Sequence, residues 1–326
     1  MKHLCQSTTW KNISTSLTAL LLMTFTVSAQ DASLEWVNKN SHEIIQADSA
    51  VGQSDLSFLK REVSGKHIVG LGEASHGTHE FYMQKAHMIS YLIQNCGFRS
   101  VAFEVPKSMM EPVDLYVQTG QGNLKDLMKG WGLYHTEEIY LLFQKLSQYN
   151  RGKTKNDRVK LVGFDNPDYW SNPFTRDKFM ADNVIRFVPG KKNKIILWAH
   201  NVHLSKDTTA EYWPMGGHLK KHFGNQFFSI ALDTYSGTAN VLNNGKFEPH
   251  AFQTSDSTLS GTLSKARYPR FFLSFNSKSN PFKGAVSLIT NIYSNWQEPK
   301  PIPIRPGEDF DAVIFIKETT PSVELK

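Results

Sequence analysis

Residues 66–104 read KHIVGLGEASHGTHEFYMQKAHMISYLIQNCGFRSVAFE, and this stretch decides the fold class. An apolar run ends at Gly72, an amphipathic stretch follows over Glu80–Gln94, and a second apolar run closes at Glu104. Strand, helix and strand in this order predict one right-handed βαβ unit. We therefore expect the two strands to lie adjacent or nearly adjacent in a parallel sheet.

Three later stretches repeat the design of an apolar run that stops at a group able to exchange a proton. They are VKLVGFD, which ends at Asp165, IILWAH, which ends at His200, and FFSIALD, which ends at Asp233. The pattern predicts an α/β fold with a mixed, mostly parallel β-sheet flanked by helices and an active site at the carboxyl ends of the strands. Helices are also expected at Asp31–Ala47, Arg176–Phe187 and Met215–Phe223, strands at Phe271–Phe275, Val286–Ile292 and Ala312–Ile316, and an extended surface loop at Pro299–Gly307.

The start of the chain has the pattern of an export signal. Two lysines precede an apolar stretch, Leu17–Val27, and Val27-Ser28-Ala29 has the small-x-small form of a signal-peptidase site. A membrane anchor is the competing interpretation, but the stretch is short and broken by Ser and Thr. We expect a signal peptide over 1–29, one α/β domain over 30–326 and an exported protein, periplasmic or secreted, without a stable membrane anchor after cleavage.

Composition narrows the class of protein further. Removal of the expected signal peptide takes away Lys2 and Lys11 and lowers the net charge from +6 to +4, which is too mild to argue for nucleic acid binding. Once residues 1–29 are removed, Cys96 is the one cysteine of the sequence, so an intramolecular disulfide cannot form. The sequence has no G-x-S-x-G nucleophile elbow, no P-loop and no G-x-G-x-x-G motif, which disfavours a serine hydrolase and a nucleotide-binding protein.

Two carboxylates and a histidine are expected to meet at the ends of the first two strands. His76 follows Glu73 by three residues in a glycine-flanked turn, and Glu104 closes a strand where a charge needs a partner. A carboxylate beside an imidazole fixes its tautomer and strengthens it as a base, which the activation of a water molecule requires. On its own, the turn fits two interpretations equally well: a functional site, or a cap of the next helix made by Glu73 and His76. The position of Glu104 at the end of the second strand favours the functional site.

Three further side chains are candidates for the same site. Lys85 lies two helical turns after His76, where it is placed to neutralise the carboxylates or to hold a developing oxyanion. His200 and His203 directly follow a strand, and their spacing suits either a zinc pair or imidazoles that polarise a carbonyl and protonate a leaving oxygen. A metal-dependent hydrolase therefore stays open on these residues alone.

Taken in order, seven segments of the chain resemble the erythromycin esterase family of hydrolases. They are GLGEASHGTHEFYMQKAHMISYLI (70–93), GFRSVAFEVP (97–106), WGLYHTEEIYLLFQKLSQYN (131–150), RDKFMADNVIRF (176–187), ILWAHNVHL (196–204), MGGHLKKHFGNQFFSIALDT (215–234) and FDAVIFIKETTP (310–321). The resemblance implies ester hydrolysis without a covalent enzyme intermediate or a cofactor. It implies that His76 activates water and that the side chains around it are Glu73, Glu104, Lys85, His200 and His203. It also implies a substrate pocket shaped by Trp131, His135 and Glu138, to which we add Asp165.

On this resemblance the chain looks like a shortened member of the family. Between Asn150 and Arg176 it has one strand and a loop, where larger relatives insert a helical section that helps to cover the cleft. Pocket walls choose the substrate, so cleavage of a macrolide does not follow from the resemblance. We predict a hydrolase of a small-molecule ester or lactone that acts by general-base activation of water. The alternatives are a metal-dependent hydrolase with the same Glu and His cluster and a non-catalytic exported binding protein of this fold.

Overall fold

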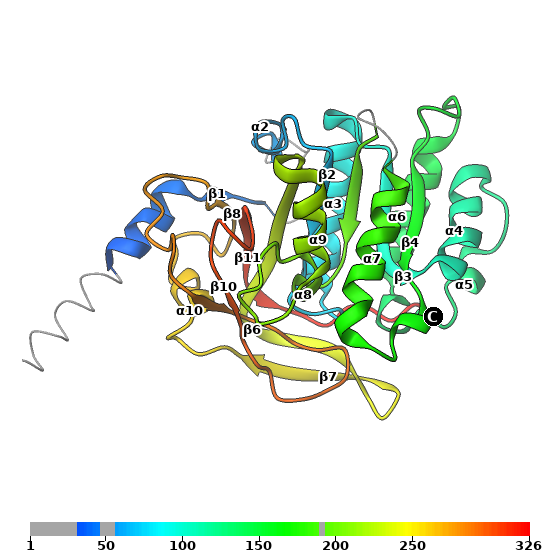
Figure 1. Ribbon diagram of the computed structural model, residues 1–326. Coiled ribbons are helices and arrows are strands. Elements are labelled where there is room, and N and C mark those ends of the chain that lie inside the picture. Colours follow the sequence, from blue (N-terminus) through cyan, green and yellow to red (C-terminus); the bar gives the residue numbers. More distant parts are fainter. Residues whose placement is uncertain (1–30, 46–55, 189–192) are drawn as a thin grey trace, which may run out of the picture.

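The computed structural model describes residues 31–45, 56–188 and 193–326, so the expected signal peptide at 1–29 lies outside the described residues. The strands are β1 (His42–Glu43), β2 (Ile68–Leu71), β3 (Ser100–Pro106), β4 (Lys160–Asp165), β5 (Ile195–Trp198), β6 (Phe227–Asn243), β7 (Lys246–Gln253), β8 (Arg270–Ser274), β9 (Ser287–Ile289), β10 (Ile302–Ile304) and β11 (Ala312–Thr319). The α-helices that follow the first one, at 31–40, are α2 (Leu59–Glu62), α3 (His79–Cys96), α4 (Lys107–Thr119), α5 (Leu124–Leu127), α6 (Glu137–Asn150), α7 (Pro173–Phe187), α8 (Asn201–Leu204), α9 (Met215–Phe223) and α10 (Leu259–Leu263) (Figure 1). Within these ranges no helix has both the length and the apolar character needed to cross a bilayer.

Nine of the described strands form one mixed sheet, in the order β1-β8-β11-β6-β2-β5-β3-β4 with β7 beside β6. The six strands from β11 to β4 run parallel, whereas β8, β1 and β7 are antiparallel to their neighbours. The expected α/β fold with a mixed, mostly parallel sheet is confirmed. β5 lies between β2 and β3, so the strands of the first βαβ unit are near neighbours.

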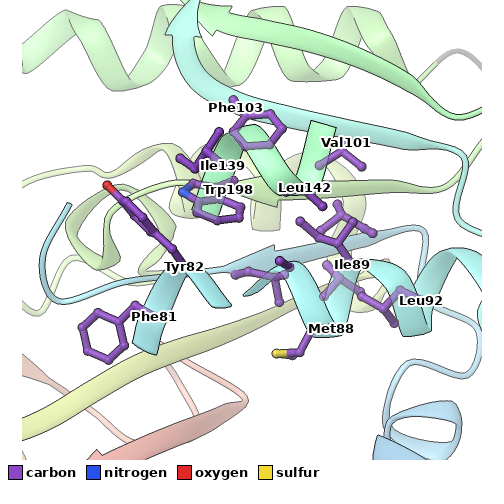
Figure 2. Close-up of a cluster of buried hydrophobic side chains, with 14 of the residues drawn as sticks. Phe81, Tyr82, Met88, Ile89, Leu92, Val101, Phe103, Ile139, Leu142 and Trp198 are labelled. Carbon is purple, nitrogen blue, oxygen red and sulfur yellow. The ribbon is translucent and has the colours of Figure 1, made fainter. Parts of the chain in front are cut away.

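Helices cover both faces of the central strands (Figure 1). On β5, Ile196 and Trp198 belong to a core shared with α3, α4 and α6, part of which Figure 2 shows. Ile195 and Leu197, on the other face of β5, belong to a second core shared with α7, α9 and α10. Burial on both faces explains why the central strands read as unbroken apolar runs.

β6 is longer than the sequence analysis predicted. We expected it to end at Asp233, but it runs on to Asn243 and turns into β7 through Asn244 and Gly245, whose φ angles are 49° and 78°. An Asn-Gly pair with both φ angles positive makes the two-residue hairpin turn that matches the twist of antiparallel strands. Asp233 is therefore a buried mid-strand residue and not a strand-end group.

Two further expectations about elements are wrong. The helix expected at Asp31–Ala47 covers 31–40 within the described residues, and His42–Glu43 instead pairs with β8. The segment 299–307, expected as a surface loop, contains β10, which buries its two isoleucines. β10 pairs with β9 in a small sheet of its own, so the strand expected at Val286–Ile292 lies outside the main sheet.

Candidate active site

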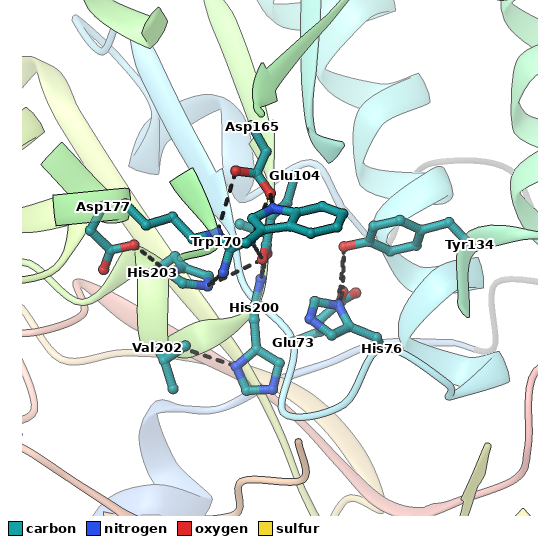
Figure 3. A network of polar contacts seen from close by, with 12 residues as sticks. Glu73, His76, Glu104, Tyr134, Asp165, Trp170, Asp177, His200, Val202 and His203 are labelled. Carbon is teal, nitrogen blue, oxygen red and sulfur yellow. Dashed lines mark hydrogen bonds and ion pairs between the residues drawn. The ribbon is translucent and has the colours of Figure 1, made fainter. Parts of the chain in front are cut away.

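The carboxyl ends of β2, β3, β4 and β5 carry the candidate site. Glu73 and His76 follow β2, Glu104 belongs to β3, Asp165 ends β4, and His200 follows β5. Because these four strands are parallel neighbours, their ends meet at one edge of the sheet. Figure 3 shows the resulting network of side chains, in which the expected groups share contacts.

Two glycines fix the path of the turn between β2 and α3. A Cβ atom on Gly72 would collide with the side chain of Asn201, and one on Gly77 would collide with the backbone of Asn240. The backbone N–H groups of these asparagines donate hydrogen bonds of 2.9 Å to the carbonyls of Glu73 and Gly77. Glycine is needed here for close approach, which lets α8 and β6 hold the turn in place.

A bulge in β3 sets the position of Glu104. The pairing of β3 with β4 changes register between Phe103 and Pro106, so β3 has one more residue there than β4. Bulges redirect side chains next to functional sites, and Glu104 lies within this one. A Cβ atom on Gly163 of β4 would lie 2.6 Å from the carbonyl oxygen of Val105, so the bulged backbone requires glycine opposite it.

Glu73 is the centre of one half of the network. Its Oε1 lies 2.7 Å from His76 Nδ1, and its Oε2 accepts a 2.7 Å hydrogen bond from Lys85 Nζ. Tyr134 Oη donates to Glu73 Oε1 at 3.2 Å and lies 3.1 Å from His76 Nδ1. Because Nδ1 faces the carboxylate, Nε2 is the ring nitrogen of His76 that is left to take a proton from water.

Lys85 is fully buried, which limits the role that we expected for it. Besides pairing with Glu73, Nζ donates to the Ala199 carbonyl at 3.2 Å and lies 4.5 Å from the ring centre of Trp198. Burial lowers the pKa of Lys85 to about 8, against the attraction of Glu73. Lys85 is thus placed to neutralise Glu73, but without exposed surface it is not placed to hold an oxyanion in the cleft.

Glu104 is the centre of the other half. Its Oε1 accepts hydrogen bonds from Arg176 Nη2 at 2.9 Å and His203 Nε2 at 3.1 Å, and its Oε2 accepts one from the His200 backbone N–H at 2.9 Å. His203 Nδ1 lies 2.5 Å from Asp177 Oδ1.

These contacts decide the charges of Glu104 and His203. Burial acts to raise the pKa of the Glu104 carboxyl, but His203, His76 and Arg176 outweigh it and hold that pKa well below the usual range. Burial acts to lower the pKa of His203, but Asp177 and Glu104 raise it to about 10. His203 is therefore an imidazolium held between two carboxylates.

His200 lies buried beside the ring of His76. Its Nδ1 accepts a hydrogen bond from Val202 N–H at 3.3 Å, and its Nε2 lies 3.2 Å from the Ile292 carbonyl oxygen. Burial, followed by the nearby His76, lowers the pKa of His200 well below its ordinary value. A buried neutral imidazole with both nitrogens engaged does not fit the expected role of protonating a leaving oxygen. The rings of His200 and His76 lie 4.9 Å apart, so His200 instead packs against His76.

The donor set does not fit the zinc pair that the spacing of His200 and His203 allowed. Both ring nitrogens of His200 contact backbone groups, and both of His203 face carboxylates. Across the ranges that the structure describes, no group of three or more His, Cys, Asp or Glu side chains is arranged to hold a metal ion.

A cleft of about 230 Å³ opens above this network. Its polar floor contains His76 and Glu104, whereas its walls are mostly apolar. Trp170 exposes 57% of its surface, and its Nε1 donates to Asp165 Oδ2 at 2.8 Å. The lining residues are His76, Glu104, Val105, Pro106, Met109, Gly130, Trp131, Gly132, Leu133, Tyr134, Asp165, Trp170, Arg176, Leu242 and Ser294.

Of the four residues expected to bind substrate, Trp131 and Asp165 line the cleft and His135 and Glu138 do not. Glu138 is buried, and its Oε1 lies 2.6 Å from His79 Nδ1 and accepts a 2.9 Å hydrogen bond from Val323 N–H. Its position at the start of α6 therefore ties that helix to α3 and to the C-terminal segment.

Sequence reasoning missed three residues of the network and one residue of the cleft wall. Arg176 and Asp177 open the segment RDKFMADNVIRF, which matched the family but was given no role at its first two positions. Tyr134 lies in GLYH, between two residues that we did name, and Leu242 is brought to the cleft by the unexpected length of β6. The Asn-Gly pair at the hairpin turn was the available signal for that length.

The sequence model of the family described as Erythromycin esterase matches residues 93–175 and 167–319, which is more than half of the chain. The chain belongs to the erythromycin esterase family. The family assignment, together with relatives named as hydrolases, identifies it as an erythromycin esterase-like hydrolase.

Two curated relatives illustrate the match. "Putative hydrolase YbfO" of Bacillus subtilis strain 168 is 23% identical, over 95% of this chain and 97% of that protein. That alignment extends over 444 positions, whereas this chain has 326 residues. The relative therefore has residues at positions where this chain has gaps. Erythromycin esterase type II of Escherichia coli is 26% identical over 114 residues, which cover 35% of this chain and 26% of that protein.

Solved structures show the same fold. The crystal structure of a succinoglycan biosynthesis protein has a TM-score of 0.81 at 19% identity and covers 92% of this chain and 99% of its own. A mutant of the erythromycin esterase EreC, in its open conformation, has a TM-score of 0.70 at 14% identity and covers 88% of this chain and 99% of its own.

Proposed function

We propose that this erythromycin esterase-like protein hydrolyses a small-molecule carboxylic ester or lactone, with His76 as the general base. The observation that carries the proposal is the 2.7 Å contact between His76 Nδ1 and the buried Glu73 carboxylate, at the floor of an open cleft. It fixes the tautomer of a histidine that substrate and water can reach. Lys85 and Tyr134 keep Glu73 in place from the buried side.

The reaction runs in two steps. His76 Nε2 takes a proton from water, and the hydroxide adds to the ester carbonyl carbon to give a tetrahedral intermediate. The intermediate then collapses with cleavage of the C–O bond, and the leaving alkoxide takes the proton back from His76. This scheme assigns to His76 the proton return that the sequence analysis gave to His200 and His203, because neither of those rings lines the cleft.

Arg176 is the cation best placed to stabilise the developing oxyanion. It lines the cleft, and its Nη2 is held by Glu104 at 2.9 Å and by Asp165 at 2.8 Å. A guanidinium has five N–H donors, so these contacts orient the group and leave others for a ligand. A donor fixed before the reaction contributes more to catalysis than one that must reorganise.

The size and walls of the cleft support a small substrate. Its volume of about 230 Å³ lies below the roughly 300–1,000 Å³ of sites that enclose drug-sized ligands. We propose that the group next to the ester is compact and partly apolar, so that it fits beside Trp131 and Trp170. A macrolide ring would have to lie largely outside this space.

Replacing the base tests the proposal. His76→Asn is expected to lower kcat/KM on aryl esters and lactones by about 10²–10⁴ while the protein stays folded. The matched control is His222→Asn, which makes the same change at an exposed position. Activity would be measured over a panel of aryl esters, lactones and macrolides, with folding followed by circular dichroism. Full turnover by folded His76→Asn would remove His76 from the mechanism.

Intact mass spectrometry tests the absence of a covalent intermediate. If the enzyme is quenched with acid during turnover of excess aryl ester, direct attack by water leaves the mass of the protein unchanged. A protein mass raised by the acyl group would show an acyl-enzyme and contradict the proposed route.

We also propose that the protein is exported after cleavage behind Ala29. The proposal is supported by the apolar stretch and the small residues that precede that position in the sequence.

A further inference from the structure

A second hollow, of about 730 Å³, lies at the edge of the sheet opposite the cleft. Ser100 and Lys160, which line it, are the first residues of β3 and β4, and Lys194 immediately precedes β5. These three strands are parallel, so their amino ends lie at the edge away from Glu104 and Asp165. The hollow is therefore separate from the candidate active site.

The lining of this hollow is strongly cationic. No aspartate or glutamate is among its lining residues, and no carboxylate in the described part of the chain pairs with any of its cations. The cations are Arg99, Lys155, Arg158, Lys160, Arg186 and Lys194. Like charges gathered around one concave space repel one another and create a local positive potential that favours an anionic ligand.

Part of this charge is held in fixed positions. Arg99 Nη1 donates 2.7 Å hydrogen bonds to the carbonyls of Ile93 and Phe98. Arg158 donates from Nε to the Lys153 carbonyl at 3.1 Å and from Nη1 to the Gln118 carbonyl at 3.0 Å. Because each guanidinium has five N–H donors, these bonds orient both groups and leave donors for a ligand.

Stabilisation of helix ends does not account for the whole cluster. Arg99 and Lys194 bind carbonyls at the end of α3, where the helix dipole favours cations. Lys155 and Lys160 belong to no helix; they are exposed, in the loop after α6 and at the start of β4. If Lys155 and Lys160 served only to keep the protein soluble, they would not need to lie around the same hollow as the other cations.

We propose that this hollow binds a compact ligand carrying several phosphate groups. Arginine side chains contact phosphate oxygens in a bidentate manner, and lysines add mobile point charges. The volume lies within the roughly 300–1,000 Å³ typical of small-molecule sites. The proposal is independent of the proposed esterase function.

Titration calorimetry of the whole protein with inorganic tripolyphosphate tests the site. We expect saturable binding that weakens as salt is raised and that tightens from orthophosphate through pyrophosphate to tripolyphosphate, because longer chains reach more cations. Absence of saturable binding, or equal affinity for orthophosphate and tripolyphosphate, would overturn the proposal.

Charge reversal locates the binding. The double variant Lys160→Glu/Arg186→Glu changes two exposed side chains of the hollow and is expected to weaken tripolyphosphate binding at least about tenfold. Its esterase activity is expected to be unchanged. The control Lys246→Glu/Lys265→Glu changes the net charge equally at exposed positions outside the hollow. An equal loss in both double variants would show a general charge effect and contradict a site here.

Discussion

The hydroxyl of Tyr134 contacts both the carboxylate and the imidazole of the proposed base pair. Burial and the neighbouring Glu73 raise the pKa of Tyr134 well above its ordinary value, so the hydroxyl stays protonated and acts as a donor. Tyr134 is thus a positioning residue for His76, because it restricts the carboxylate that orients the ring.

Tyr134→Phe is expected to lower kcat by about threefold to tenfold with KM unchanged. The variant loses one net hydrogen bond but keeps the aromatic wall of the cleft. Steady-state kinetics would measure both constants. Tyr82→Phe is the control, because it removes another buried phenol hydroxyl, one that donates to the Leu133 carbonyl. Equal losses in the two variants would contradict a positioning role for Tyr134.

His203→Gln is expected to lower the free energy of unfolding by about 3–5 kcal/mol, because it leaves the buried Glu104 and Asp177 without their shared cation. The folded-state pKa of about 10 lies above the ordinary 6.5, so this stabilisation is complete below about pH 6.5 and is lost as pH rises towards 10. Chemical denaturation at several pH values would measure it, with His218→Gln as control. A pH-independent difference, or one under about 1 kcal/mol, would show that His203 is not a buried imidazolium.

For single residues, the sequence predicted which side chains lie at the ends of strands. It did not predict which other side chains form hydrogen bonds or ion pairs with them. Glu73, Glu104 and His200 follow apolar runs, so the parallel sheet predicts their meeting. Arg176 and Asp177 come from the start of a helix, and nothing in their local sequence says which carboxylate or imidazole they face. For the same reason, the burial of Lys85 was not predictable from its position two turns into α3.

Among the elements, β6 differs most from expectation, and Asp233 shows the consequence. This carboxyl is buried in mid-strand, where its Oδ2 accepts a 2.7 Å hydrogen bond from Ser260 Oγ and its Oδ1 accepts a 3.1 Å bond from Thr290 N–H. Burial raises its pKa to about 7, although these hydrogen bonds act in the opposite direction. Asp233 therefore connects β6 to α10 and to the chain after β9, in a form that depends on pH.

Asp233→Asn is expected to flatten the pH dependence of stability. In the wild-type chain the unfolded carboxyl ionises above about pH 4 while the folded one stays protonated to about pH 7, so stability is lost as pH rises between these values. Asparagine has no proton to lose. Its Oδ1 can still accept the hydrogen bond from Thr290 N–H, and its Nδ2 can donate to Ser260 Oγ, which reverses the direction of that bond. Thermal melting across this range would compare the wild type, Asp233→Asn and the exposed control Asp168→Asn. A slope that Asp233→Asn leaves unchanged would contradict the raised pKa.

Helices and strands were predictable where the apolar residues of a segment followed a single periodicity. Met215–Phe223 forms a helix at the expected residues, and the expected helix at Glu80–Gln94 forms as α3. The errors occur where tertiary pairing overrides local preference. His42–Glu43 leaves the helical pattern to pair with β8, and Ile302–Ile304 within the proline-rich 299–307 segment forms a strand because β9 offers it a partner.

For the whole molecule, the alternation of apolar strands and amphipathic helices was enough to predict the α/β class. The order of the strands was not predictable, because β5 enters between β2 and β3 from more than 90 residues further along the chain. The size of the cleft also depends on this long-range packing, which is why the resemblance to the family did not define a substrate.

Export makes a prediction for the whole chain. When the protein is expressed in a Gram-negative host, we expect to find it outside the cytoplasm with Gln30 as its first residue. Cell fractionation would measure the location, and intact mass and N-terminal sequencing would identify the first residue. Ala29→Lys is expected to block processing, because the peptidase accepts small residues at this position. Recovery of the unprocessed chain from the cytoplasm in both forms would contradict export.

The hairpin of β6 and β7 has a consequence for how this fold can change over time. β6 is hydrogen-bonded into the main sheet at one end and presents Leu242 to the cleft near its other end, close to the Asn244-Gly245 turn. Residues gained or lost at this tip would reshape one wall of the cleft while the proposed catalytic groups, anchored on other strands, stay where they are. A change at a surface turn would therefore alter which molecules fit the cleft and leave the proposed chemistry in place.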